Sequence, residues 1–287
     1  MVKLQHSILR SREVQTSNLQ LYRFDLPKAG CYSALDISFR IQNGATSAIN
    51  LDILDIIKHI SLVVNGNDYR YHIKGQDLFR YHWQKYGRPM PYTFTEKGSA
   101  TQEVWFRLAF GRFLGDPQFG LDLSRFANVQ VQIDYDAVAA WGAAAAGTFT
   151  TGTCAITLVA HEFPRASRPS FRGMIGVREF WTGTTAASGT IEENLPTANM
   201  ILAVGVSCLE DGVAEATDIT DIKIGKDNYN VVWIDGKWYL YQDLINNELD
   251  VREEHYDLYV ASTQVKDTHL ANIKSAVVTP RVHTVPT

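Results

Sequence analysis

Four short segments from the first half of the chain recur in the same order in the second half. Asp25-Leu26-Pro27-Lys28-Ala29 recurs as Asn194-Leu195-Pro196-Thr197-Ala198. The other pairs are Ile57-x-x-Ile60-x-Leu62 with Ile219-x-x-Ile222-x-Ile224, Gln76-Asp77-Leu78 with Gln242-Asp243-Leu244, and Ala127-Asn128-Val129 with Ala271-Asn272-Ile273. One tripeptide match arises by chance, but four in one order predict two similar units in tandem. The alternative is two unrelated β-domains that share turn chemistry.

The spacing of the repeat also predicts where the copies differ. Gln76 and Gln242 are farther apart along the chain than Ala127 and Ala271, so the first copy carries extra chain between its third and fourth segments. We expect this extra chain in longer loops at 88–98 and 111–122, which are rich in Gly, Pro and aromatic residues. After Ala271 about one strand of chain remains, so the register of the last strands is left open.

Hydrophobic alternation within each copy is that of β-strands. In 34–41, for example, Leu35, Ile37, Phe39 and Ile41 alternate with smaller or polar residues. Similar stretches are 104–110, 128–135, 155–160, 199–207, 231–234 and 257–261. Asn65-Gly66 and Asp235-Gly236 lie between apolar runs, where such dipeptides predict tight hairpin turns. Within the two copies, the best helical patterns are at 76–86 and 242–249.

These patterns predict an all-β protein made of two tandem β-sandwiches or barrels, with short helices in the connecting loops. The strand pattern is interrupted at Phe163–Ser170, which contains two prolines. We therefore expect three parts: an N-terminal arm at 1–24, a first β-unit at 25–165 and a second at 166–287.

Charge and composition exclude several classes of function. The net charge is −4, with 27 basic and 31 acidic residues, so nothing drives the whole chain onto nucleic acid, and we expect no sequence-specific nucleic-acid binding. Cys31, Cys154 and Cys208 are isolated from one another, which favours buried packing over disulfides or zinc. The N-terminus lacks the apolar core of a secretory signal. The uncharged stretch 137–160 is too rich in Gly and Thr for a membrane span and predicts a loop followed by a strand.

No catalytic constellation emerges, and we expect no enzymatic activity, cofactor or metal. The eight histidines include no HExxH pair; the clusters at His161-Glu162 and Glu253-Glu254-His255 are interpreted as solvated or interface residues. Asp134 with Asp136, and Asp218 with Asp221, have the residue type of glycosidase pairs, but charge at strand ends explains them more simply. Two groups of aromatic residues suit a core and an interface better than a sugar platform: Tyr69, Tyr71, Tyr81, Trp83, Tyr86 and Tyr92, and Trp233, Trp238, Tyr239 and Tyr241.

Residues 1–23 include four basic side chains and one acidic side chain, although the rest of the chain is net acidic. The apolar residues Leu4, Ile8 and Leu9 share a face if 2–13 is helical, which predicts a short amphipathic basic helix. A disordered tail is the alternative. The candidate membrane-contact or shell-contact residues are Lys3, Leu4, Ile8, Leu9, Arg10 and Arg12.

Two tandem sandwiches of this size, each with a short helix after about its fourth strand, resemble the double jelly roll. That is the fold of the major capsid proteins of tailless icosahedral DNA viruses, the lineage of adenovirus and the membrane-containing bacteriophages. The resemblance rests on the repeat segments and covers about Leu26 to Val285. It implies upright homotrimers whose six barrels give a pseudo-hexagonal outline, with the N-terminal arm facing an internal lipid membrane.

The sequence, with this resemblance, therefore predicts a major capsid protein, which is a structural subunit of an icosahedral virion. The protein is expected to be made in the host cytoplasm. Its expected partners are other copies of itself, minor capsid or penton proteins, and an internal membrane contacted by the N-terminus. The alternatives are a β-sandwich carbohydrate-binding or spike/adhesin module, and a glycoside-active jelly roll.

Overall fold

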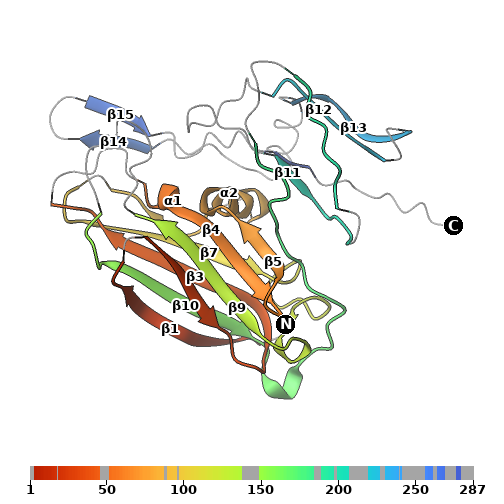
Figure 1. Ribbon diagram of the computed structural model, residues 1–287, viewed down its shortest axis with the longest axis horizontal. Helices are drawn as coiled ribbons and strands as arrows, with labels where there is room; N and C mark the ends of the chain where they lie inside the picture. The colour runs from red at the N-terminus through yellow and green to blue at the C-terminus, as the bar shows by residue number, and fades with distance from the viewer. Residues whose placement is uncertain are drawn as a thin grey trace. The chain divides into compact units, whose positions relative to one another are not determined.

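The structure is a computed structural model of the chain (Figure 1). It describes residues 3–17, 19–45, 52–86, 89–95, 97–137, 149–183, 189–196, 199–206, 219–226, 230–238, 240, 256–260, 264–268 and 276–278. The chain divides into two compact units, one formed by 1–79 with 90–193 and the other by 80–89 with 194–287. The three-part division into arm, first jelly roll and second jelly roll stays a prediction.

The first unit contains two antiparallel sheets. One sheet has the order β1 (Gln5–Gln15), β10 (Cys154–Glu162), β3 (Cys31–Gln42), β7 (Thr101–Ala109) and β6 (Tyr92–Thr93), with β8 (Leu121–Asp122) also beside β3. The other has the order β2 (Leu19–Asp25), β9 (Val129–Asp136), β4 (Ile57–Val64) and β5 (Asp68–Ile73). Short helices in the connections are α1 (Ile53–Ile56), α2 (Gly75–Tyr86), η1 (Leu123–Arg125) and η2 (Arg165–Ser167).

The strand pairs are nested along the chain, which is the pattern of a jelly roll. The β4–β5 hairpin is innermost, β3 then pairs with β7, β2 with β9, and β1 with β10. Folding this long antiparallel ribbon over itself places β1, β3, β7 and β10 in one sheet and β2, β4, β5 and β9 in the other. The predicted jelly-roll class is confirmed for this unit.

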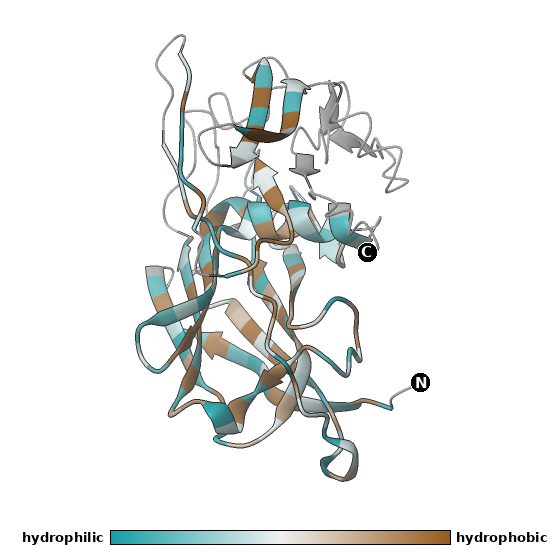
Figure 2. Cartoon of the chain, turned by 90° about the vertical axis from the view of Figure 1, so that its right-hand side faces the viewer, coloured by the Kyte–Doolittle hydropathy of each residue, from teal (hydrophilic) through white to brown (hydrophobic). Residues whose placement is uncertain are grey.

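The predicted alternation places the core between the sheets. Leu35, Ile37, Phe39 and Ile41 are at most 1% exposed, and β9 alternates strictly between buried and half-buried residues. Figure 2 shows the resulting brown and teal bands along the strands. Burial of these apolar side chains, worth about 1.5–3 kcal/mol each, is the main force holding the sheets together.

One of the two predicted hairpin turns is confirmed and the other is wrong. Asn65 and Gly66 have φ of 52° and 83° and join β4 to β5, as a tight hairpin turn requires. Asp235 and Gly236 instead lie within β13 (Val231–Lys237), paired with Lys223 and Ile222 of β12 (Asp221–Lys226). The connection between those strands falls between Lys226 and Val231, and a 3.2 Å ion pair from Lys223 fixes Asp235 in the ladder.

The two predicted helices have different outcomes. The helix expected at 76–86 is α2, which begins one residue earlier at Gly75. The helix expected at 242–249 lies outside the described residues. The loops predicted at 88–98 and 111–122 contain only β6 and β8 as regular structure among their described residues.

The expected N-terminal helix is wrong, because Gln5–Gln15 is the edge strand β1 and Leu19–Asp25 is β2. The backbone of β1 pairs with β10 from Gln5 opposite Glu162 to Gln15 opposite Cys154. A short isolated helix is only marginally stable in water, whereas a strand added to the edge of a sheet forms a ladder of backbone hydrogen bonds with its neighbour. The residues therefore alternate across a sheet, and Leu4, Ile8 and Leu9 do not share one face.

A strap formed by residues 163–182 follows β10 and wraps the first sandwich. Gly173 accepts a backbone hydrogen bond from Gly120. Further along the strap, the backbone N–H of His72 in β5 donates to Val177 O, and Glu179 N–H donates back to His72 O. The strap therefore covers the outer edge of β5, which would otherwise expose unpaired backbone groups.

The second unit contains three described strand pairs. They are β11 (Val204–Val206) with β16 (Ala276–Val278), β12 with β13, and β14 (Tyr256–Val260) with β15 (Gln264–Thr268). The β12–β13 hairpin matches β4–β5 as the repeat predicts, and Leu195 packs on the cluster of Val204, Ile224 and Ile234.

The fourth repeat pair does not carry over to strand pairing. β16 comes after Ala271-Asn272-Ile273 and pairs with β11, whereas β9 begins at Val129 of the first copy's segment and pairs with β2 and β4. The sequence left the register of the last strands open, and the β11–β16 pairing now gives it.

The stretch 137–160 contains the predicted strand, because β10 begins at Cys154; residues 138–148 lie outside the described part. Among the described residues, no helix is both long and apolar enough to cross a bilayer.

Candidate functional site

The outer face of the first sheet carries a buried polar network. Asp36 of β3 accepts two hydrogen bonds from Arg107, at 2.6 and 2.7 Å, and its carboxylate lies 2.7 Å from His161 Nε2. Asp36 and His161 are 8% and 4% exposed, although their strands point these side chains away from the core. Of the two roles expected for the His161-Glu162 cluster, a solvated one is therefore wrong for His161, which is buried, and an interface role stays a prediction. Glu162 lies 3.5 Å from Arg168.

This network balances opposing effects on the Asp36 carboxyl. Burial alone would raise its pKa, but hydrogen bonds from Arg107 and His161 and their charges bring the pKa below its usual value. The carboxylate is thus kept ionised, and the bidentate Arg107 contact ties β3 to β7. The contacts of Asp36 hold β3 to β7 and to β10, whereas the buried His161 Nδ1 has no hydrogen-bond partner among the described residues.

The predicted arm residues lie in or beside β1 and differ in burial and contacts. Leu4 packs against the cluster of Cys31, Phe163 and Phe171, and Leu9 is half-buried. Arg10 lies 2.9 Å from Glu13 and 4.4 Å from the centre of the Phe24 ring. Leu4 therefore packs into the sandwich, whereas the Arg10 side chain is 47% exposed and makes its contacts at the surface.

The remaining arm residues are exposed. Ile8 is 69% exposed, and Lys3 and Arg12 both face solvent. Arg12 has φ of 48° at one of two β-bulges and donates its N–H to Thr157 Oγ1 at 3.2 Å. The strand between Lys3 and Arg12 spans about 30 Å. The two cations therefore lie at opposite ends of β1.

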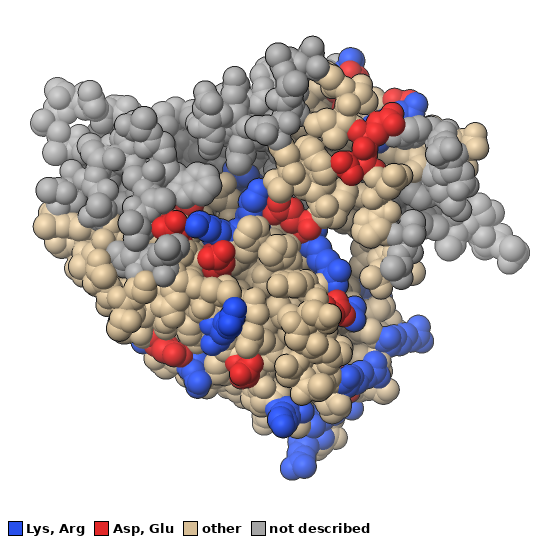
Figure 3. Space-filling view, in the orientation of Figure 1, with Lys and Arg blue, Asp and Glu red and all other residues tan. Residues whose placement is uncertain are grey.

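Lys3 lies at the end of the sandwich where the strap begins, because Gln5 pairs with Glu162. The strap adds exposed cations there, namely Arg165, Arg168 and Arg172. In Figure 3 blue side chains gather at the lower end of the first unit, where η2 lies in Figure 1. This end is therefore a basic surface, whereas the sequence analysis predicted a basic segment only at residues 1–23.

The loop between β7 and β8 is held by a fully buried carboxylate. Asp116 accepts hydrogen bonds from Arg112 N, Nε and Nη2 at 3.1, 2.8 and 3.1 Å, and from Gln118 N at 2.9 Å. The Arg112 side chain accounts most for lowering the pKa of Asp116 to about 2. Gly111 has no room for a side chain, since a Cβ there would lie 2.7 Å from Asp116 Cβ. The loop is thus a rigid element.

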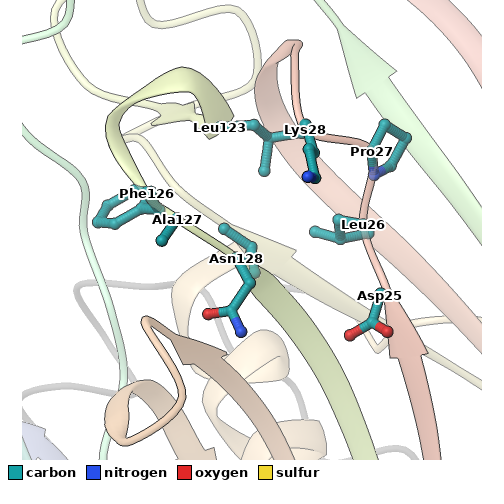
Figure 4. A pocket seen from close by; sticks show the side chains of 9 residues that line it. Asp25, Leu26, Pro27, Lys28, Leu123, Phe126, Ala127 and Asn128 are labelled. Atoms are coloured by element: carbon teal, nitrogen blue, oxygen red, sulfur yellow. The ribbon is translucent and has the colours of Figure 1, made fainter.

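A small pocket lies at the same end, between the β2–β3 connection and the residues preceding β9 (Figure 4). Its volume is about 220 Å³, and its floor is made by the buried residues Leu26, Leu123 and Val129. Pro27 and Phe126 are on its wall. The pocket joins two of the repeat segments, since Leu26 N–H donates to Val129 O at 2.8 Å. In the first sandwich these two segments therefore close one end.

A second carboxylate, that of the half-buried Asp52, has the opposite behaviour. Asp52 caps α1 by accepting from Leu54 N at 2.8 Å, and Tyr92 Oη donates to it at 2.5 Å. Burial, followed by the charge of nearby Asp55, raises the pKa of Asp52 to about 7. Its ionisation near neutral pH therefore opposes folding.

The sequence candidates for chemistry are used in ion pairs or in the core. Asp136 lies 2.9 Å from Lys58 Nζ, and Asp221 lies 2.9 Å from Lys237; Asp218 is outside the described residues. Tyr71 is 1% exposed and donates to Ala109 O. No group of three His, Cys, Asp or Glu side chains within the described parts could hold a metal ion.

The structure brings together two histidines that spacing alone does not reveal. The rings of His59 and His72 stack at 4.5 Å on neighbouring strands, and Ser61 Oγ lies 2.9 Å from His72 Nδ1. Glu179 of the strap lies 4.0 Å from His59 and 3.4 Å from Lys74. Burial lowers the pKa of His59, followed by the charge of His72. The pair therefore fastens the strap rather than forming an open site.

Comparison with solved structures identifies the fold. The chain matches the major capsid protein of Sulfolobus turreted icosahedral virus with a TM-score of 0.64 and 14% identity, covering 96% of this chain and 84% of that one. A second structure from that virus has a TM-score of 0.62 and 14% identity, covering 96% of this chain and 79% of that one. The major capsid protein P2 of bacteriophage PM2 has a TM-score of 0.53 and 11% identity, covering 96% of this chain and 82% of that one. No protein-family model and no curated protein matches the sequence. The predicted double jelly roll is confirmed.

Asp52 and Asp116 predict opposite effects of the same substitution. Because the pKa of Asp52 is raised, its contribution to the free energy of unfolding is fully present below pH 3.8, the usual pKa of an aspartate, and is lost as the pH rises through about 7. Asp52→Asn keeps a cap acceptor and removes this loss, so we expect it to stabilise the protein at pH 8 by about 1 kcal/mol and to have little effect at pH 4. Thermal unfolding at both pH values measures the difference.

Asp116→Asn is the matched control. The contribution of Asp116 to the free energy of unfolding is present above pH 3.8 and is lost as the pH falls through about 2. The Asp116→Asn variant should therefore be destabilised by about 1–3 kcal/mol at pH 8. Equal destabilisation of both variants at pH 8 would contradict the account of the Asp52 site.

Proposed function

We propose that the chain is a major capsid protein, a structural and non-enzymatic subunit of an icosahedral virion. The observation that supports this most strongly is the double jelly-roll fold shared with viral major capsid proteins over 96% of the chain. The residues that hinted at other chemistry are engaged in ion pairs, strand contacts and packing. The alternative of a carbohydrate-binding or adhesin module has less support, because Tyr71, Trp83 and Trp238 of the two aromatic groups are buried.

The proposed assembly unit is a homotrimer. Two jelly rolls in each of three chains give six similar walls, so one polypeptide fills a hexagonal position in a shell by closed symmetry. Minor capsid or penton proteins are expected at positions where this six-fold outline does not fit. The virion is the proposed location.

Purified chain should form trimers as its concentration is raised. Sedimentation equilibrium is the measurement, and the expected result is a species with three times the mass of the chain. A strictly monomeric protein that binds a glycan array would contradict the proposal and favour the adhesin alternative.

The basic end of the first sandwich is the proposed surface toward an internal membrane. The expected contact by the N-terminus is revised here, because Lys3 lies at the basic end of the sandwich whereas Arg12 lies about 30 Å away along β1. Lys3 is joined instead by Arg165 and Arg172 of the strap. Each cation near an anionic surface contributes about 1 kcal/mol, and many copies on one shell add their contributions.

Replacing Lys3, Arg165 and Arg172 together by Gln should weaken binding to vesicles made of phosphatidylcholine mixed with anionic phosphatidylglycerol. The loss of about 3 kcal/mol corresponds to about a hundredfold weaker binding in co-sedimentation. Arg12→Gln is the control and should bind as the wild type does. Equal effects of the two variants, or no effect of either, would argue against this orientation.

A further inference from the structure

The loop between β7 and β8 presents two adjacent apolar side chains to solvent. Phe113 and Leu114 are 53% and 44% exposed. We call residues 112–115 the knob. An isolated exposed apolar residue is ordinary, but two at the tip of one ordered loop form a compact apolar projection.

The knob is built to keep its shape. At its base the buried Asp116 carboxylate binds three nitrogen atoms of Arg112. At its other side Gly115 has φ of 85° and donates its N–H to Ser33 Oγ at 2.8 Å. Such a frame fixes the loop before any contact forms, so docking would cost little conformational entropy.

The pocket at the same end of the sandwich has the size and lining for one such side chain. Its volume of about 220 Å³ is below that of typical small-molecule sites, which are about 300–1,000 Å³. Its floor is Leu26, Leu123 and Val129, and its rim includes Asp25 and Lys28. This shape favours a single aromatic ring as the occupant, with the polar rim of the pocket around it.

On one side of the rim the charge is complementary to the knob, whereas Lys28 on the same rim has the same sign as Arg112. The Arg112 side chain is 49% exposed beside Phe113, and it remains accessible while bound to Asp116. The Asp25 carboxylate lies on the rim of the pocket, where it accepts a hydrogen bond from Gln130 Nε2 at 2.8 Å. A ring entering the pocket would bring a guanidinium toward this carboxylate.

We propose that Phe113 of one copy inserts into the Leu26–Leu123–Val129 pocket of a neighbouring copy. This rests on the proposed function, in which copies stand side by side. Knob and pocket are different surfaces of one chain, and no knob residue lines its own pocket. The contact is therefore heterologous, so it closes into a ring or continues from one assembly unit to the next.

The first test compares two Phe→Asp variants. Phe113→Asp should raise the concentration for half-association by about tenfold or more in sedimentation velocity, because a charged side chain cannot enter the apolar pocket. Phe180→Asp is the matched control, since Phe180 is 48% exposed on the strap and belongs to neither surface. Both variants should keep the wild-type melting temperature, because neither residue is in the core. Unchanged association of Phe113→Asp would overturn the proposal.

The second test locates the contact directly. Chains carrying Phe113→Cys and differently tagged chains carrying Lys28→Cys are co-expressed and treated with a short bismaleimide. We expect a cross-linked heterodimer, with none from either variant co-expressed with wild type. Absence of this product from trimers would overturn the knob contact and leave the proposed function intact, whereas a wild type that never associates would overturn both.

Discussion

The first sandwich depends on the nested pairing of strands around the β4–β5 hairpin. The left-handed backbone at Asn65 and Gly66 sets the innermost register, and each later pair joins segments farther apart, out to Gln5 opposite Glu162. Closing such loops costs chain entropy before any contact is gained, so the outer pairs form only because they bury a continuous apolar layer. The strictly alternating β9, paired on both sides, provides much of that layer.

Nesting also decides where the contact surfaces lie. The β2–β3, β4–β5 and β7–β9 connections meet at one end, where Asn65 N–H donates to Asn128 O and Leu26 N–H donates to Val129 O. The strap joins them there, since Arg172 N–H donates to Gln118 O. The rigid loop, the small pocket and the exposed cations are therefore features of a single end of the first sandwich.

Local patterns predicted what is decided locally. The alternation in β3, the helix α2 and the turn at Asn65-Gly66 follow from spacing and turn chemistry. Asp235-Gly236 shows the limit, because the same kind of dipeptide lies inside a strand once cross-strand pairing sets the register. The N-terminal strand could not be predicted either, since its partner β10 is far away along the chain and its exposed edge needs no apolar alternation.

The candidate site was predictable only in part, for the same reason. Basic character near the N-terminus was visible in the sequence, but the strap arginines join Lys3 only through the β1–β10 pairing. The roles of Asp36 and Asp116 depend on partners that folding brings together or orients. The most direct test of the central claim is electron microscopy of the purified protein with three-fold averaging. The account predicts particles with six similar lobes, two from each chain; particles with three lobes, or single separate units, would contradict it.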